Sequence, residues 1–118
     1  MIILYGIPNC DSTRKAQKWL QAHAIPYRLH NYKEQGITAQ KLKQWCSKAG
    51  WQTIFNKRSS TWKQVMKAYE GLVNNPAEAI QIMQQHHSII KRPIIEAGEQ
   101  LLIGFDEKQY QQLVKQHL

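Results

Sequence analysis

Hydrophobic residues recur at two different periods along the N-terminal part of the chain. Residues 2–5 form a short apolar run that a glycine and a proline end, as is typical of a buried strand. Across residues 9–24 apolar side chains recur three and four positions apart, which predicts an amphipathic helix that Asn9 or Asp11 can cap. Apolar and polar residues then alternate at 27–31, which predicts a second strand.

The rest of the chain continues with helical spacing before it returns to strand-like runs. Thr38 is placed to cap a helix, and Gly50 is placed to end it. Three further helical segments are predicted at residues 53–56, 62–69 and 77–85. Two apolar runs around a short turn, 89–95 and 101–104, then predict a β-hairpin. Asp106 can cap a last helix. The apolar side of that helix is expected to carry Tyr110, Leu113, Val114 and Leu118.

The predicted order is βαβ, a helical middle, then ββα. A parallel crossover followed by a hairpin gives a mixed four-stranded sheet covered by helices. This is the layout of an α/β protein with a thioredoxin-like fold and a helical insertion. We expect a single domain over residues 1–118, with the insertion at about 36–87.

Composition excludes several classes of protein. Hydrophobic residues make up 42% of the chain and charged residues 20%, which is ordinary for a globular domain. The apolar runs are far shorter than the roughly 20 residues of a transmembrane helix, and the N-terminus lacks the pattern of a secretory signal. We therefore expect a cytoplasmic protein that does not enter a membrane.

The net charge indicates partners of the opposite sign. Sixteen lysines and arginines stand against eight acidic residues, a net charge of +8. This charge is compatible with nucleic acid, an acidic protein or a small anion. The basic residues are spread along the chain without a block of five, which does not favour nucleic acid. Most of these charged residues are interpreted as surface residues that keep the protein soluble.

Cys10 is the residue that points most directly to chemistry. It follows the first predicted strand and lies at the mouth of the first predicted helix, between polar neighbours and away from an apolar stripe. A helix N-terminus favours a thiolate over a thiol, and the thiolate is the nucleophile. Cys46 instead shares a helix face with apolar residues and is expected to be buried and inert.

No set of residues has the spacing of a metal site, and we expect none. The adjacent pair His86–His87 lacks the i, i+4 spacing of helical ligands and reads as a solvated helix end. Arg92, between two apolar runs, is expected to emerge at a strand end facing solvent or an anion. Pro93 follows it, and a minority of such bonds are cis.

Three segments together resemble the arsenate reductase (ArsC)-like family. Residues 2–16, around Pro-Asn-Cys, resemble its N-terminal signature, 51–58 its middle element, and 90–95 followed by 102–105 its C-terminal signature. The resemblance is strongest to the YffB-type branch of small glutathione-dependent thiol reductases. The regulator Spx belongs to the same family.

The resemblance implies roles for individual residues. It implies a thioredoxin-like fold, with Cys10 as the nucleophile and Arg92 as the anion-binding arginine before a cis proline, Pro93. It also implies a middle arginine, for which Arg58 is the candidate. Asn9, beside the cysteine, completes the predicted substrate-binding set.

At two positions this chain carries a different residue from the one that the resemblance to this family implies. Arsenate reductases of this family carry an arginine directly after the glycine of the last strand, where this chain has Phe105. Spx-type regulators often carry Cys-x-x-Cys at the first motif, where this chain has Thr13 at the second position. An arsenate contact and an intramolecular disulfide at this motif are therefore both missing.

These features together predict a thiol oxidoreductase with no bound cofactor. Cys10 attacks an oxidised or anionic substrate, and glutathione serves as the co-substrate that resolves the adduct. Two alternatives stay open. One is an Spx-like regulator that binds an RNA polymerase subunit, and the other is genuine arsenate reduction.

Overall fold

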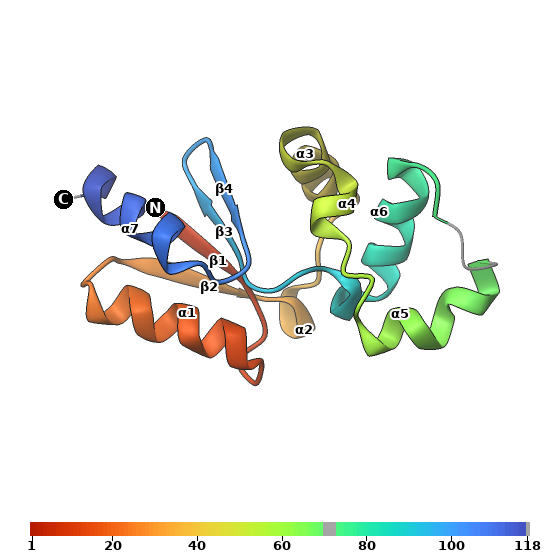
Figure 1. Ribbon diagram of the computed structural model, residues 1–118, viewed down its shortest axis with the longest axis horizontal. Coiled ribbons are helices and arrows are strands. Elements are labelled where there is room, and N and C mark those ends of the chain that lie inside the picture. The colour runs from red at the N-terminus through yellow and green to blue at the C-terminus, as the bar shows by residue number, and fades with distance from the viewer. Residues whose placement is uncertain (70–72, 118) are drawn as a thin grey trace. The chain divides into compact units, whose positions relative to one another are not determined.

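A computed structural model of the chain describes residues 1–69 and 73–117, and its contacts divide into two compact units. The first unit comprises Met1–Gln35 and Arg92–Leu118, and the second comprises Gly36–Lys91. Both are drawn in Figure 1. The assignment of the whole chain to one domain, with an insertion at about 36–87, stays a prediction.

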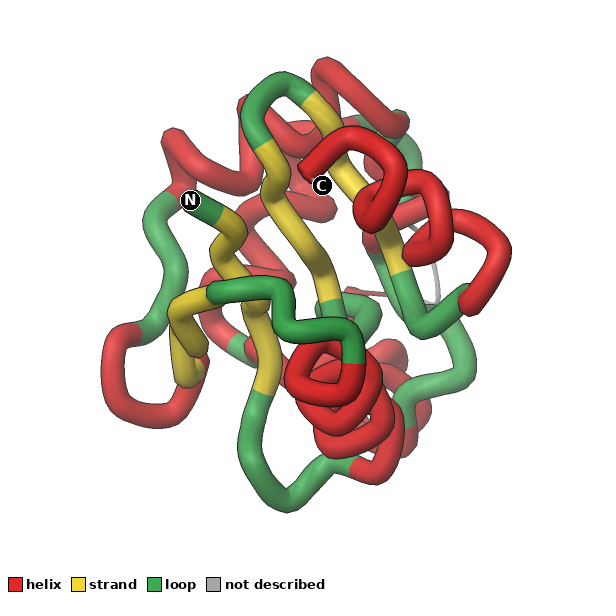
Figure 2. Tube along the Cα trace, turned by 90° about the vertical axis from the view of Figure 1, so that its left-hand side faces the viewer, coloured by secondary structure: helices red, strands yellow, loops and turns green. Residues whose placement is uncertain are grey.

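The first unit is an α/β layer structure. Its elements are β1 (Ile2–Gly6), α1 (Asp11–Ala22), β2 (Tyr27–Asn31), α2 (Tyr32–Gln35), β3 (Ile94–Ala97), β4 (Gln100–Ile103) and α7 (Glu107–His117). The strands form one sheet in the order β2-β1-β3-β4 and lie side by side in yellow in Figure 2. β1 pairs with β2 in parallel, and β3 is antiparallel to both β1 and β4. The predicted mixed sheet and thioredoxin-like fold are confirmed.

One face of this sheet builds the main core of the unit. Alternate residues of β1, such as Ile2 and Leu4, point to the same side of the sheet and are buried there. The amphipathic faces of α1 and α7 pack on that side through Trp19, Leu20 and Tyr110. This packing fixes α1 against β1, so the chain between them holds Cys10 in a defined place.

The second unit is helical. Its elements are α3 (Ala39–Ala49), α4 (Trp51–Ile54), α5 (Ser60–Val65), the 3₁₀ helix η1 (Met66–Tyr69), α6 (Pro76–Gln85) and the 3₁₀ helix η2 (His87–Ile89). Thr38 caps α3 by accepting a hydrogen bond from the Lys41 N–H at 3.1 Å, as its sequence position predicts. Gly50 follows α3 with a φ of +85°, a backbone region that favours glycine.

The hairpin begins later than its apolar pattern predicts. Residues 89–95 were expected to form its first strand, but β3 starts at Ile94. The isoleucines before it satisfy their backbone groups inside the second unit. Ile90 forms a bridge with Phe55, and the Ile89 carbonyl accepts a hydrogen bond from the Asn56 N–H at 2.7 Å. An apolar run alone does not distinguish this pairing with distant residues from the first strand of a hairpin.

Two smaller differences concern the helices, and one predicted cap is confirmed. The helix predicted at 53–56 is α4, which begins two residues earlier, directly after Gly50. α2 was not predicted, because four residues carry too little pattern. Asp106 does cap α7, since its side chain accepts a hydrogen bond from the Lys108 N–H at 2.9 Å. Leu118, expected on the apolar side of α7, lies outside the described residues.

Candidate active site

Cys10 occupies the N-cap position of α1, at the end of a short loop that follows β1. The Cys10 N–H donates to the Ile7 carbonyl at 3.1 Å, and the Cys10 carbonyl accepts from the Arg14 N–H at 2.9 Å. The prediction that Asn9 or Asp11 caps this helix is therefore wrong. Cys10 takes the capping position itself, and none of the described side chains caps the helix in the usual way. The first N–H groups of α1 are left for the cysteine.

The surroundings of the Cys10 sulfur favour its ionised form. Partial burial acts to raise the pKa of the thiol, but hydrogen bonds and a positive charge act against it. These are the backbone N–H and side chain of Thr13, the backbone N–H of Ser12, and the charge of Arg92. Together they outweigh burial, so the pKa of Cys10 lies below its ordinary value.

The sequence pattern did not identify Thr13 as a site residue, because it showed only that a threonine stands where a second cysteine would be. Its side chain is completely buried in the first turn of α1, three residues after Cys10. Gly6 permits this arrangement, because a Cβ atom at position 6 would lie 2.5 Å from the Thr13 hydroxyl oxygen. A hydroxyl three positions after an N-cap cysteine is the signal that could have identified it.

Arg92 and Pro93 lie just before β3, in the same unit as Cys10. Arg92 is half-buried and acts on the Cys10 sulfur through its charge. The Arg92–Pro93 peptide bond is cis, as the family resemblance implies. Pro93 is buried, and its carbonyl accepts a hydrogen bond from the Gly104 N–H at 2.7 Å. The structure therefore brings Arg92 and Cys10 into electrostatic contact.

The acidic neighbour of Cys10 is directed away from it. The Asp11 carboxylate is 85% exposed and pairs with the guanidinium of Arg14 one turn later on α1. Asn9 is exposed in the loop before Cys10, where it is accessible to a ligand. Its proposed contact with substrate stays a prediction.

Arg58 belongs to the second unit. It is exposed in the turn between α4 and α5, where its N–H donates to the Asn56 side-chain oxygen at 3.1 Å. Its predicted role as the middle anion-binding arginine stays a prediction.

A polar and aromatic cluster on the sheet was not predicted from the sequence. The Tyr5 hydroxyl donates to the Glu96 carboxylate at 2.6 Å, across neighbouring strands. The ring of Tyr5 also lies 4.7 Å from His30 and 6.3 Å from Tyr32 between centroids. Burial, followed by the Glu96 hydrogen bond, raises the pKa of Tyr5. Register between distant strands creates this cluster, so no local pattern signals it.

Phe105 occupies the position at which the family resemblance implies an arginine in arsenate reductases. Its ring packs edge-to-face on Tyr110, with 5.2 Å between centroids, and it lies against the main core. It also lines a shallow hollow of about 410 Å³ with Lys15, Lys18 and Trp19. This side chain adds packing and offers no group to an anion.

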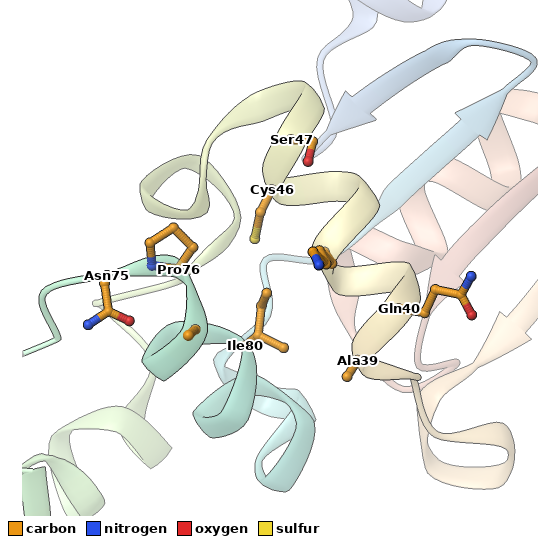
Figure 3. Close-up of a pocket in the computed structure, with 9 residues that line it drawn as sticks. Ala39, Gln40, Cys46, Ser47, Asn75, Pro76 and Ile80 are labelled. Atoms are coloured by element: carbon orange, nitrogen blue, oxygen red, sulfur yellow. The ribbon is translucent and has the colours of Figure 1, made fainter.

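Cys46 differs from its expected burial. It is half-buried and lines a groove of about 910 Å³ between α3 and the N-terminal end of α6 (Figure 3). Pro76 and Ile80 stand across the groove from it. The packing of α3 against α6 leaves this opening, which the apolar stripe of α3 alone does not reveal. Burial raises the pKa of the Cys46 thiol.

The reactivities of the two cysteines can be compared directly, because both side chains are half-buried but their thiol pKa values are shifted in opposite directions. At neutral pH we expect iodoacetamide to alkylate Cys10 at least about tenfold faster than Cys46, since only the thiolate reacts. Single-cysteine variants, C46A and C10S, allow each rate to be measured separately. In denaturant the two rates should converge. Equal rates in the native protein would contradict the difference in thiolate population.

Within residues 1–69 and 73–117, no group of three or more His, Cys, Asp or Glu side chains is placed to hold a metal ion. Among those same residues, no helix is long and apolar enough to cross a membrane.

Comparison with known proteins shows the family to which this chain belongs. Residues 5–113 match the ArsC family, so the chain belongs to the ArsC family. An uncharacterised protein of Haemophilus influenzae is 40% identical over 111 residues, which is 94% of this chain and 96% of the relative. The global transcriptional regulator Spx 1 of Lactococcus lactis is 34% identical over 109 residues, covering 91% of this chain and 84% of the regulator.

Solved structures agree with this assignment. A YffB protein is 37% identical and aligns with a TM-score of 0.92 over 97% of this chain and 99% of its own. An arsenate reductase (ArsC) related protein from Brucella melitensis is 32% identical, with a TM-score of 0.74 over 97% and 94% of the two chains. The family thus contains arsenate reductase-related proteins and Spx regulators, and this chain is similar to both.

Proposed function

We propose that this protein is a thiol oxidoreductase in which Cys10 is the single nucleophile and glutathione is the external reductant. The observation that carries the proposal is the Cys10 sulfur at the N-terminal end of α1, where Thr13, Ser12 and Arg92 together lower its pKa. A lowered pKa supplies thiolate at neutral pH, and the thiolate is the reactive form of cysteine. The reaction is expected to take place in the cytoplasm and to need no bound cofactor.

The proposed cycle has two thiol–disulfide exchange steps. The Cys10 thiolate attacks one sulfur of a substrate disulfide, forms a new S–S bond and releases the other sulfur as a thiolate. Glutathione thiolate then attacks the sulfur joined to Cys10, regenerates the Cys10 thiolate and leaves in a new disulfide. A second glutathione reduces that disulfide, so two glutathione molecules supply the two electrons. Thr13 in place of a second cysteine at this motif favours such external resolution.

Anion binding is proposed to fall mainly to Arg92. A guanidinium binds a carboxylate through two parallel hydrogen bonds, and glutathione carries two carboxylates. Asn9 and Pro93 flank the cysteine and the arginine, and Arg58 is proposed to add a further positive charge. Arsenate itself is a weaker candidate, because Phe105 packs on the core where an arginine would contact the oxyanion.

Mass spectrometry of the protein incubated with glutathione disulfide tests the proposal. We expect one glutathione adduct, located on Cys10, that reduced glutathione removes. The C46A variant should form the same adduct and C10S should form none. An unmodified Cys10 under these conditions would contradict the assignment. Arsenate-dependent consumption of glutathione by the same protein would restore arsenate as a substrate.

A second candidate function is binding to an RNA polymerase subunit, as an Spx-like regulator. The specific observation that favours it is the distribution of charge. Residues 36–91 contain eight basic and two acidic residues, so this segment holds +6 of the net charge of +8. A strongly basic helical unit suits an acidic protein surface. The similarity to proteins named Spx supports the same function.

The two candidates are separated by a pull-down with purified RNA polymerase beside the glutathione-coupled assay. A reductase without polymerase binding supports the first function. Retention of polymerase by the C10S variant, with no turnover by the wild-type protein, supports the second.

A further inference from the structure

The shallow hollow between α1 and the start of α7 combines aromatic rings with positive charge. Trp19 and Phe105 form its apolar part, and its other lining residues are Lys15, Lys18 and Glu107. Trp19 is 8% exposed and Phe105 is half-buried, so each ring keeps some surface that a ligand can cover. The proposed cycle leaves this hollow without a role.

Packing holds the aromatic floor of the hollow in place. Both rings pack edge-to-face on Tyr110, which is completely buried, with 5.4 Å to Trp19 and 5.2 Å to Phe105 between centroids. The Tyr110 hydroxyl donates to the Gly104 carbonyl at 3.1 Å, which fixes the backbone next to Phe105. A preformed apolar surface loses little conformational freedom when a ligand covers it.

The rim of the hollow carries a net positive charge. Lys15 and Lys18 are exposed there, and they stand against one acidic lining residue, Glu107. In the part of the chain that the structure describes, neither lysine forms an ion pair. An apolar floor beside two ammonium groups suits a ligand that combines an aromatic group with a carboxylate.

Phe105 connects the hollow to the segment that carries the proposed anion-binding arginine. The Gly104 N–H donates to the Pro93 carbonyl at 2.7 Å, and Phe105 is the next residue after Gly104. Pro93 follows Arg92 directly. The floor of the hollow is therefore joined to the Arg92 segment through one hydrogen bond.

Helix α1 sets the distance from the rim of the hollow to the nucleophile. Lys15 and Lys18 follow Cys10 by five and eight residues on this helix. At about 1.5 Å per residue, their Cα atoms lie roughly 7.5 and 12 Å from Cys10 along the helix axis. An extended peptide advances about 3.3–3.6 Å per residue, so two or three residues span this distance.

We propose that this hollow is a substrate subsite for peptide disulfides that carry an aromatic side chain and a carboxylate two or three residues from the reacting cysteine. The inference rests on the proposed function and names its substrate class. The Cys10 thiolate attacks the sulfur of that cysteine and an S–S bond forms, while the other sulfur of the substrate leaves as a thiolate. The aromatic group covers Phe105 and Trp19, and the carboxylate lies at the lysines.

Two peptide disulfides, of Cys-Gly-Phe and of Cys-Gly-Ala, test the aromatic part of the subsite. Mass spectrometry follows the rate of mixed-disulfide formation in C46A protein, so that only Cys10 can react, and each rate is divided by that with free glutathione in solution. We expect the Phe peptide to react about tenfold faster, because its ring loses apolar contact with water. Phe105→Ala should reduce this preference to about twofold or less.

A third peptide, Cys-Gly-Phe with a C-terminal amide, tests the charged part. We expect the free carboxylate to react about two- to fivefold faster than the amide, as is usual for exposed ion pairs. Lys15→Gln and Lys18→Gln should each reduce this advantage, and salt should screen it. Lys115→Gln is the matched control, because Lys115 is exposed on α7 but does not line the hollow, and it should keep the full advantage.

Two results would overturn the subsite. One is equal reaction of the Phe and Ala peptides, and the other is an aromatic preference that Phe105→Ala leaves intact in a protein that thermal unfolding shows to be folded. If Phe105→Ala does not fold, the lysine variants decide the question, since their side chains are exposed. A carboxylate advantage that Lys15→Gln and Lys18→Gln leave unchanged would then contradict the subsite.

A binding experiment without chemistry separates this proposal from the proposed function. The S-methyl form of Cys-Gly-Phe cannot exchange, and its binding to C10S protein is followed by NMR titration. Binding that Lys18→Gln weakens, with no disulfide formed at Cys10 by any peptide, would support the subsite and contradict the reductase. Normal adducts at Cys10 without any preference among the peptides would contradict the subsite alone.

Discussion

Substitution of Cys10 by serine should abolish glutathione-coupled reduction, with a loss of roughly 10⁴-fold or more. The reason is chemical, because a serine hydroxyl cannot form the mixed disulfide through which the proposed cycle runs. The folded state should survive the change. Cys10 is half-buried and is not one of the residues of the main core, so we expect the free energy of unfolding to stay within about 1 kcal/mol of wild type.

Cys46→Ala provides the matched control for this experiment. Cys46 lies in the second unit and lines the groove between α3 and α6. We expect this variant to keep full turnover and to form the glutathione adduct on Cys10. The account would be contradicted by a C10S protein that still turns over, or by a C46A protein that does not.

The second large effect is expected for Arg92. Its replacement by lysine keeps the positive charge but removes the planar fork that binds a carboxylate through two hydrogen bonds. Hydrogen bonds to charged groups contribute about 1.5–3 kcal/mol, so kcat/KM should fall roughly 10- to 100-fold. The free energy of unfolding should change by less than about 1 kcal/mol, because the side chain is only half-buried.

Titration of the thiol separates the two contributions of Arg92. The charge of Arg92 lowers the pKa of Cys10, so Arg92→Lys should leave that pKa near its wild-type value, whereas Arg92→Ala should raise it. Arg28→Lys, an exposed arginine on β2 of the same unit, is the control that should leave turnover unchanged. If R92K loses stability in proportion to activity, Arg92 is a structural residue instead.

The elements that the sequence predicts well are those with strong local signals. Thr38 and Gly50 mark the two ends of α3 through a side-chain cap and a positive φ, and both effects depend on residues only a few positions away. The apolar run of β1 is similarly unambiguous, because it packs within a sheet and is bounded by turn-forming residues. Cys10 could be identified from the sequence as the candidate nucleophile for the same reason, since the local pattern predicts a helix N-terminus there.

The remaining features depend on distant residues. Tyr5 reaches Glu96 across 91 positions of sequence, and only the strand register brings them together. Ile89 and Ile90 look like the start of a hairpin but pair with Asn56 and Phe55. Thr13 is a different case. Its position is local, but its importance comes from the enclosure of its hydroxyl beside Gly6, which is a matter of tertiary packing.

The pKa of Cys10 is the quantity on which the whole account depends. It is measured most directly as the difference in thiolate absorbance between wild type and C10S, followed against pH. The account predicts a midpoint below the value of about 8.5 for an unperturbed cysteine, because the groups that favour the thiolate outweigh burial. The shifted pKa of Cys10 also makes the free energy of unfolding depend on pH, in a direction that can be predicted. A depressed pKa adds stability that is present above about 8.5 and is lost as the pH falls through the folded-state value. A midpoint at or above 8.5, together with no glutathione adduct on Cys10, would contradict the central claim and would leave the polymerase-binding function as the better explanation.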